Sequence, residues 1–410
     1  MPRCYVCCSK NIEELLDLGL QPIANRFLAS QWHEEQMYPM VMNQCRDCGL
    51  IQINEPVPAE DLRPQYDWVT YTEPEDHLDH LVQVIKTLPG ITSKSNFCGI
   101  SWKDDSTLAR LERLGFSKIR RLDPQVDLNI VQSNFGIETI QSHLTPETAS
   151  KISKRLGKFD VVITRHILEH AHDVAGFIEA LKNLAQNGGY IIFEVPDCSR
   201  ALETYDYSTV WEEHNLYFTP LTFQHSLVRL GFSTYRYKCY PYPFENSLVG
   251  IVQDQKNEVN PGFPGEALES ECLRGRVFAE NLSMLAEKMQ RLLCEYRNKQ
   301  EKVALFGAGH LACAFVNLLG IKDYIDFFVD DNPHKRGLFM PGCRLPICES
   351  AAQRRENVRL CLLSLNPLSE GKVLQTHQDW RGTFLSIFPS SPLALRIPES
   401  LGVPEESKCL

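Results

Sequence analysis

Two cysteine pairs near the start of the chain constrain its fold more than any other feature. Cys4 and Cys7 form one CxxC pair, Cys45 and Cys48 form the second, and 37 residues lie between the pairs. Each pair can present two thiolates on one side of a tight turn, so together they supply the four sulfurs of a tetrahedral Zn²⁺ site. We predict a structural zinc, because four protein ligands leave no coordination position open for chemistry. Cys8 is a less favoured substitute for Cys7.

The cysteine count supports the same interpretation. The chain has 410 residues and 15 cysteines, five of which fall in the first 48 positions. In a reducing compartment such clustering favours metal binding over disulfides. Two CxxC pairs without a thioredoxin-like pattern beside them also argue against a redox site. The other ten, such as Cys313 and Cys361, stand mostly in apolar contexts, which is typical of small buried side chains.

Charge and hydropathy limit the partners of the chain. A net charge of -10 argues against a nucleic-acid-binding face, which is normally basic. The longest apolar runs, such as Val161–Ile163 and Tyr190–Phe193, are too short to span a bilayer, and the segment Met1–Cys4 begins no apolar signal sequence. We therefore expect a cytoplasmic protein that binds neither nucleic acid nor membrane and acts on a small molecule, as a monomer or weak homo-oligomer.

Apolar periodicity divides the chain into four segments. They are a zinc-binding segment at 1–60, a mixed segment at 61–255, a linker with a long helix at 256–300, and a C-terminal segment at 301–410. In the mixed segment, strand-sized runs alternate with helical patterns, which indicates a parallel sheet covered by helices. We expect strands there at 95–101, 119–122, 159–164, 190–195, 232–240 and 248–253, and helices at 106–114, 174–185 and 221–230.

The C-terminal segment repeats the strand–turn–helix pattern. A strand at 302–306 leads into Gly307-Ala308-Gly309, then a helix at 310–319 and a strand at 325–329. This pattern predicts a second Rossmann-like unit. The long helix before it is expected from about Ala267 to Gln300, and the residues after about Pro398 read as a loose tail.

Cofactors of doubly wound sheets bind beyond the carboxyl ends of the strands. The turn after the first strand contains a single glycine, and we take Gly99, Ser101 and Asp104 in this turn as cofactor-binding candidates. Asp123 follows the second strand 24 residues after Gly99, which is close to the spacing of a ribose-binding carboxylate. The alternative interpretation of Asp123 is a turn aspartate before a proline.

Polar side chains also follow the third strand. His166, Glu169 and His170 stand where the strand ends and would point into the same crevice, with His166 a further candidate for cofactor binding. A lone histidine at such a position is more often structural, but two histidines beside a glutamate make a functional role equally credible.

Four stretches follow one another in a specific order. The first has Cys4-x-x-Cys7, LGLQPIANRF at 18–27, and Cys45-x-x-Cys48 followed by GLIQ. The second is 159–171, the third is WEEHNLYF at 211–218, and the fourth has GAG at 307–309 and VDDNPHKRG at 329–337. Together they resemble the zinc-binding domain, methyltransferase core, catalytic EHxxYF stretch and third domain of the nucleotide-sugar C-methyltransferases. The resemblance covers nearly the whole chain.

The resemblance implies fold, cofactors and chemistry. The fold would be α/β, with a class I methyltransferase (Rossmann-like) core, a small N-terminal zinc-binding domain and a second Rossmann-like C-terminal domain. The family uses S-adenosylmethionine to methylate a carbon beside the keto group of a dTDP-linked deoxysugar. Such a carbon is weakly acidic, so a base must remove its proton and a neighbouring group must stabilise the enolate oxygen.

The same resemblance assigns roles to individual residues. His214 matches the family base, Glu213 would orient its imidazole or hold the sugar, and His170 would lie near the keto oxygen. A family tyrosine corresponds to Tyr66 or Tyr71, and Tyr71 is the candidate that we retain.

Three positions depart from the family pattern and keep other functions open. The S-adenosylmethionine turn has one glycine, Trp211 stands where the family has tyrosine, and His310 begins the stretch where a lysine is usual. The alternatives are a methyltransferase with another acceptor, a degenerate nucleotide-sugar-binding protein, and an NAD(P)-dependent oxidoreductase. The oxidoreductase would use Gly307-Ala308-Gly309 with Asp330, 21 residues after Gly309. The sequence does not identify the sugar or the methylated carbon.

Overall fold

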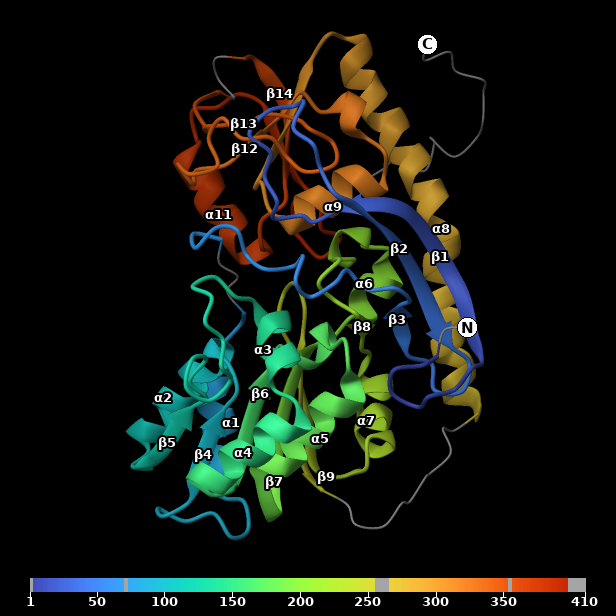
Figure 1. The fold of residues 1–410 in the computed structure, drawn as a ribbon. Helices are drawn as coiled ribbons and strands as arrows, with labels where there is room; N and C mark the ends of the chain where they lie inside the picture. The colour runs from blue at the N-terminus through green and yellow to red at the C-terminus, as the bar shows by residue number, and fades with distance from the viewer. Residues whose placement is uncertain (1–2, 70–72, 255–264, 353–355, 397–410) are drawn as a thin grey trace. The chain divides into compact units, whose positions relative to one another are not determined.

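The chain forms two compact units, each with its own core (Figure 1). The computed structural model describes residues 3–69, 73–254, 265–352 and 356–396. The first unit consists of Met1–Leu15, Val41–Ser199 and Glu213–Leu273. The second consists of Leu16–Met40, Arg200–Glu212 and Arg274–Leu410. The tail expected after Pro398 lies outside the described residues.

The first unit contains a six-stranded sheet in the order β5-β4-β6-β7-β10-β9. Its strands are β4 (Asn96–Gly99), β5 (Lys118–Arg121), β6 (Phe159–Arg165), β7 (Ala185–Pro196), β9 (Phe232–Tyr240) and β10 (Ser247–Asp254). All six strands expected from the sequence are present. Strands β5, β4, β6 and β7 run parallel to their neighbours, as expected.

Strand β10 departs from the expected parallel arrangement. It runs antiparallel to both β7 and β9. Only residues 241–246 connect β9 to β10. A parallel connection needs a crossover of a dozen or more residues, so this short loop permits only a hairpin.

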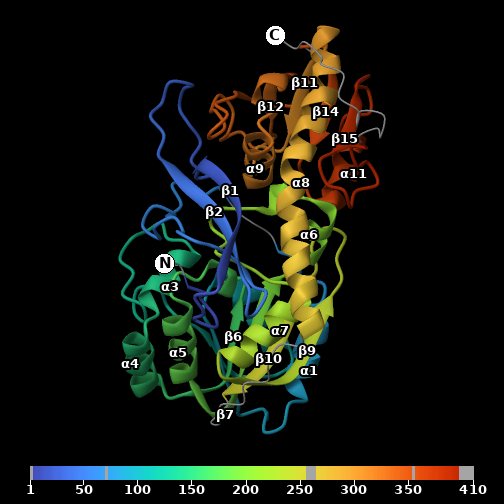
Figure 2. The same cartoon turned by 90° about the vertical axis from the view of Figure 1, so that its right-hand side faces the viewer.

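Both faces of this sheet are buried, because side chains of successive strand residues point to opposite sides. Along β6, Phe159 and Val162 belong to one core cluster, and Val161 and Ile163 belong to the other. Helices α3 (Ile137–His143), α4 (Pro146–Leu156), α5 (Val174–Leu184) and α7 (Pro220–Arg229) contribute to the first cluster, and α1 (Leu78–Lys86) and α2 (Asp105–Arg113) to the second. Figure 2 shows α4 and α5 on one side of β6 and β7 and α1 on the other.

Local signals explain where these helices begin and end. In α4, the Thr145 side chain accepts the backbone N–H of Thr148, and Pro146 occupies the first turn, where no N–H is needed. The helix stops at Gly157, whose φ of 81° suits glycine better than any other residue. The expected helices at α2, α5 and α7 are confirmed, whereas α1, α3 and α4 were not expected from the sequence.

The second unit contains a five-stranded parallel sheet in the order β13-β12-β11-β14-β15. Its strands are β11 (Lys302–Phe306), β12 (Phe327–Val329), β13 (Ile347–Cys348), β14 (Val358–Leu363) and β15 (Thr383–Ser386), with helices α9 (His310–Leu318) and α11 (Pro367–Thr376). Gly307 begins the turn between β11 and α9 with a φ of 100°. A Cβ atom there would meet Ser364 Oγ at 2.8 Å. The expected second Rossmann-like unit is confirmed.

A third sheet has four strands in the order β1-β2-β3-β8. Its strands are β1 (Ile12–Pro22), β2 (Met37–Cys45), β3 (Ile51–Ile53) and β8 (Leu216–Tyr217). The long helix expected from about Ala267 to Gln300 is α8 (Gly265–Asn298). Strands β1 and β2 and helix α8 contain residues of both units. Among the described residues, no helix is both long and apolar enough to cross a membrane.

Candidate functional site

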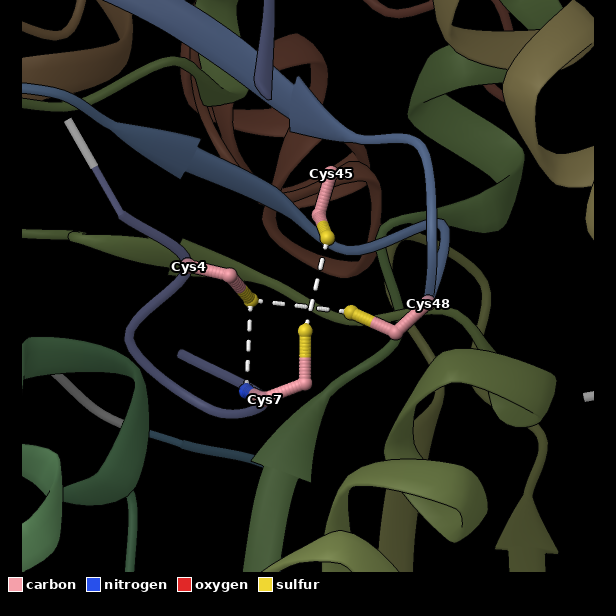
Figure 3. Close-up of side chains that lie close together, drawn as sticks. All are labelled: Cys4, Cys7, Cys45 and Cys48. Carbon is pink, nitrogen blue, oxygen red and sulfur yellow. Dashed lines mark hydrogen bonds between the residues drawn. The ribbon is translucent and has the colours of Figure 1, made fainter. Parts of the chain in front are cut away.

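The four cysteines of the two CxxC pairs converge at one point of the first unit (Figure 3). Cys4 Sγ lies 3.6 Å from Cys48 Sγ, and Cys7 Sγ lies 3.5 Å from Cys45 Sγ. A tetrahedron of sulfurs about 2.3 Å from zinc has edges of roughly 3.8 Å, so these separations fit a single Zn²⁺ ion. Cys8 is exposed and is not part of the cluster. The predicted ligand set is therefore confirmed.

Two tight turns bring the sulfurs together. In the first, Cys8 donates its backbone N–H to the carbonyl of Cys4, and the N–H of Cys7 points at Cys4 Sγ, 3.5 Å away. In the second, Gly49 donates to the Cys45 carbonyl and has a φ of 73°, a conformation that favours glycine. Cys4, Cys45 and Cys48 are buried and belong to the same core cluster as side chains of α5 and α7. This packing is what a structural zinc centre requires.

The carboxyl edge of the six-stranded sheet holds a buried charged network. The turn after β4 is closed by Asp104, which is fully buried. Its Oδ2 accepts the backbone N–H groups of Ile100 and Ser101, and its Oδ1 accepts that of Arg165 at the end of β6. A Cβ atom on Gly99 would lie 2.8 Å from Asp104 Cβ, so this close approach explains the single glycine of the turn. Burial raises the pKa of Asp104 to about 7.

Arg165 and Glu194 form the centre of this network. Arg165 Nε donates to Glu194 Oε2 at 2.5 Å, and both side chains are almost completely buried. Glu194 also accepts from Ser247 Oγ at 2.8 Å, and His77 Nε2 lies 3.1 Å from its Oε1. Burial disfavours ionised Glu194, but Arg165 and His166 outweigh it and hold the pKa of Glu194 well below its usual range. Four chain segments are thereby joined at one carboxylate.

His166 is the cation of the network that lies nearest to the strand end. Its Nε2 lies 3.2 Å from Glu194 Oε1, and its Nδ1 lies 3.3 Å from Glu169 Oε1 and 4.0 Å from Glu73 Oε2. Burial alone would lower the pKa of His166, but Glu73 and the other two carboxylates raise it to about 10. His166 is thus a buried imidazolium at neutral pH.

Two further carboxyl groups, Glu73 and Glu245, lie near His166. Burial, reinforced by the charge of Glu73, raises the pKa of Glu245 to about 8. Glu73 itself receives a hydrogen bond from Lys103 Nζ at 2.6 Å. Its pKa is lowered despite burial, because His166 and Lys103 favour its ionised form. The carboxyl groups at this edge therefore lie among three cations, Lys103, Arg165 and His166.

His170 and His214 meet next to this edge. His170 ends the 3₁₀ turn η2 (Leu168–His170), and its Nδ1 lies 2.8 Å from Glu138 Oε1 of α3. The ring of His214 stands nearly perpendicular to that of His170, with 4.7 Å between the centroids. Acid–base atoms of Glu138, His170 and Glu213 lie within 4.8 Å of one another. The three residues that the resemblance assigns to catalysis, His170, Glu213 and His214, are thus neighbours.

Asn215 explains why His214 lies there. The buried Asn215 donates its backbone N–H to the Glu169 carbonyl at 2.7 Å and its side-chain amide to the His170 carbonyl at 3.0 Å. The next two residues form β8, which pairs with β3. The segment before β8 is therefore fixed to η2 by an amide side chain and a short strand.

The remaining predicted residues take several positions. Ser101 caps the turn after β4, with Oγ accepting the Lys103 N–H. Asp123 is exposed after β5, and its Oδ1 accepts the N–H groups of Gln125 and Val126. These two hydrogen bonds are those of a turn aspartate, the alternative role expected for Asp123. Binding of a ribose by Asp123 stays a prediction. Tyr71 lies outside the described residues.

The second glycine turn is self-contained in the second unit. Asp330 Oδ2 accepts the Ala308 N–H at 2.9 Å and pairs with Lys335 Nζ at 2.8 Å. The carboxylate that a dinucleotide ribose would need is thus engaged within the protein. Trp211 stacks on His310 at the start of α9, with 4.2 Å between the rings.

Five residues of the edge were not found from the sequence. They are Glu73, Glu138, Arg165, Glu194 and Asn215. Asn215 carried a signal, because it stands inside the stretch WEEHNLYF. Glu138 carried none, since its partner His170 is 32 residues away and on another element.

Comparisons with known families match the chain in three parts. Residues 4–62 match a family model described as a zinc binding domain, and residues 102–236 match one described as a methyltransferase domain. Residues 271–389 match a model described as a C-methyltransferase C-terminal domain. The order of the three matches is the order that the resemblance implied.

The chain is also similar to one curated relative and, more weakly, to solved structures. The C-methyltransferase NovU of Streptomyces niveus is 23% identical over 364 residues, covering 84% of this chain and 85% of the relative. An O-methyltransferase family protein from Burkholderia thailandensis aligns at 15% identity and a TM-score of 0.28, over 45% of this chain and 59% of that one. Magnesium protoporphyrin IX methyltransferase from Synechocystis aligns at 14% identity and a TM-score of 0.30, over 44% and 83%.

Proposed function

We propose that this chain, which belongs to the C-methyltransferases with a zinc-binding, a methyltransferase and a C-terminal domain, methylates a carbon beside the keto group of a nucleotide-linked deoxysugar. The methyl donor is S-adenosylmethionine. The observation that carries the proposal is the meeting of His170, Glu213 and His214 beside the strand ends, where the donor of such a fold binds.

The turn after β4 fits the donor. Close approach of Gly99 to Asp104 leaves no room for a side chain there, so the glycine lets the turn close at the strand end where the donor binds. Asp104 holds the turn through three backbone N–H groups and acts as a positioning residue rather than a ligand. Asp123 would hold the ribose hydroxyls with its free oxygen. Ionised Glu73 supplies a negative charge at this edge, which suits a donor whose sulfur and amino group are both cationic.

His214 removes the proton from the carbon beside the keto group. Its side chain is half-buried, so a substrate can reach the imidazole, which must be neutral to accept a proton. His170 holds the keto oxygen. Glu138 lies against its Nδ1, so Nε2 is the ring nitrogen that can donate a hydrogen bond to the negative charge that develops on that oxygen. The enolate carbon then attacks the methyl group bound to sulfur.

The zinc centre does not take part in these steps. Its four cysteine ligands fill the tetrahedron, so the ion has no position for substrate. Its contribution is to fix the turns that precede β3.

A hydrogen-exchange experiment tests this function without a methyl donor. The protein is mixed with a nucleotide keto-deoxysugar and a non-reactive donor analogue in D₂O, and deuterium uptake beside the keto group is followed by NMR. Wild type should exchange, and His214→Ala should lose roughly 10²–10⁴-fold in rate, the usual contribution of a general base. Donor affinity should be unchanged in this variant.

His143→Ala is the matched control. His143 lies on α3, as Glu138 does, and its ring contacts the Leu128 carbonyl instead of the site. It should exchange at the wild-type rate. Exchange by His214→Ala at that rate would assign the base to another residue. Tight binding of both ligands by wild type without any exchange or methyl transfer would instead favour a nucleotide-sugar-binding protein.

A further inference from the structure

The histidine pair belongs to a cluster with the composition of a metal site. Glu169 Oε, His170 and His214 each offer one ligand atom, and these atoms lie within 4.8 Å of one another. Two imidazoles with one carboxylate form a common donor set for divalent transition metals. The set is separate from the four cysteines, whose sulfurs already complete a tetrahedron.

The orientation of His170 supports metal binding. Its Nδ1 lies 2.8 Å from Glu138 Oε1, so Nε2 is the nitrogen that would serve as the ligand. Metal-ligating histidines almost always direct their other ring nitrogen to a carboxylate or carbonyl group, because this contact fixes the tautomer and raises basicity. Glu138 is 3% exposed, so the contact is shielded from water.

Glu169 supplies a second, independent observation. Its side chain is 1% exposed, and neither of its carboxylate oxygens has a hydrogen-bond partner among the described residues. Oε1 lies 3.3 Å from His166 Nδ1, outside hydrogen-bond geometry, and Oε2 has no such neighbour. The charge of His166 offsets part of the cost of burying Glu169, but a buried carboxylate oxygen without a hydrogen bond is still costly, so Oε2 calls for a ligand that can accept its lone pairs.

We propose that Glu169, His170 and His214 bind one divalent transition-metal ion of the Zn²⁺ and Co²⁺ class, and that this ion inhibits the enzyme. The inhibition rests on the proposed function. An imidazole nitrogen that is bound to a metal has no lone pair for a proton, so metal-bound His214 cannot act as the base. His170 would likewise lose the Nε2–H that stabilises the enolate oxygen.

Binding is tested first, without activity. Protein whose cysteine site is filled with zinc is titrated with Co²⁺ alone and followed by visible absorption and by metal analysis after gel filtration. We expect one Co²⁺ per chain beyond the zinc, with weak bands typical of nitrogen and oxygen ligands. Intense charge-transfer bands from thiolates would show exchange into the cysteine site and would contradict the proposal, as would no stoichiometric Co²⁺.

Three variants locate the ion. Glu169→Gln and His170→Ala remove ligands and should abolish the additional Co²⁺, and Glu138→Gln should weaken it by roughly 10–100-fold, as loss of an orienting carboxylate does. His143→Ala on the same helix as Glu138 should bind Co²⁺ like wild type. Zinc content and circular dichroism show that each variant is folded. Equal affinity in folded Glu169→Gln and His143→Ala would overturn the assignment.

The exchange assay then separates this inference from the proposed function. Co²⁺ at saturating concentration should stop deuterium exchange by wild type, and a chelator that spares the cysteine-bound zinc should restore it. Failure of Co²⁺ to bind would refute the metal site and leave the base assignment intact. Stoichiometric binding without loss of exchange would keep the metal site and refute His214 as the base.

Discussion

The cysteine cluster and the charged edge of the sheet are both buried and both join distant parts of the first unit, yet they are built differently. The cluster uses four identical ligand atoms from two short turns. The edge joins the Arg165 guanidinium of β6, a hydroxyl of β10 and the imidazoles of His77 before α1 and His166 after β6, with the carboxylate of Glu194 on β7 as their common partner. The cysteine cluster comes from one short sequence pattern, CxxC, that occurs twice. The charged edge forms only when the strands of the sheet come together.

The difference also sets how each is stabilised. Metal–thiolate bonds stabilise the cluster directly, since the site forms together with its fold. The buried pair of Arg165 and Glu194 must first offset the loss of hydration of both charges. The loss of stability when one partner is removed therefore tells more about burial of the pair than the presence of the pair does.

The largest effect is expected at the cysteine cluster. Cys45→Ser should lose the bound zinc and unfold the N-terminal turns, because apparent zinc binding in such sites contributes on the order of 10 kcal/mol. Metal analysis and limited proteolysis measure both effects. Cys8→Ser, outside the cluster, should retain one zinc per chain. Full zinc occupancy in Cys45→Ser would refute the ligand set.

The next effect is expected at the centre of the charged edge. Glu194→Gln keeps the shape of the side chain but leaves the charges of Arg165 and His166 without their main partner. We expect a loss of about 3–5 kcal/mol in the free energy of unfolding, measured with urea. Asp254→Asn, which removes an exposed pair with Lys182, should cost no more than about 1 kcal/mol. Equal losses in the two variants would show that the edge is not a buried network.

A smaller effect is expected for donor binding at Asp123. Asp123→Ala should weaken S-adenosylmethionine by roughly ten- to a hundredfold, or about 1.5–3 kcal/mol, because a charge-assisted hydrogen bond to the ribose is lost. Isothermal titration measures this affinity. Asp105→Ala removes another exposed carboxylate and should bind the donor normally. Unchanged affinity in Asp123→Ala would leave this residue with its turn role alone.

The smallest effect is expected from a rise in pH, which should weaken the charged edge and leave the cysteine cluster intact. Because the pKa of His166 is raised to about 10, its contribution to stability is complete below its usual value near 6.5 and is lost as pH rises through about 10. Zinc-bound thiolates are already deprotonated and do not weaken in this range. Urea midpoints should therefore fall above pH 9 while zinc stays bound. A zinc loss that precedes the fall would reverse this order.

Features that depend on local sequence were predictable, whereas features that depend on packing between elements were not. The zinc ligands were predictable because each pair shows its own spacing, and short apolar runs predicted the six strands of the first unit's sheet together with β11 and β12. Strands β13, β14 and β15 were not expected from the sequence. Helix α3 was missed, and with it Glu138, whose contact with His170 depends on how α3 packs beside β6. The antiparallel β10 was also missed, since periodicity gives a strand but not its direction.

The residues that we propose for catalysis form an intermediate case. His170, Glu213 and His214 were assigned by resemblance to a family, and the structure brings them together. Spacing alone could not have joined them, because 44 positions separate His170 from His214. Asp104 was expected to contact the cofactor, but its carboxylate is occupied by backbone N–H groups.

The pairing of β3 with β8 bears on the order in which the first unit assembles. Strand β3 starts three residues after the last zinc ligand, Cys48, and β8 starts two residues after His214. Ile51 pairs with Tyr217, a contact of very high sequence separation, and such contacts carry a large loop-closure cost and form late in folding. A metal ion bound just before β3 restricts the conformations of that segment, which lowers the entropy cost of pairing β3 with β8. We therefore expect zinc to act on the chemistry indirectly, by ordering the strand with which the segment after His214 pairs.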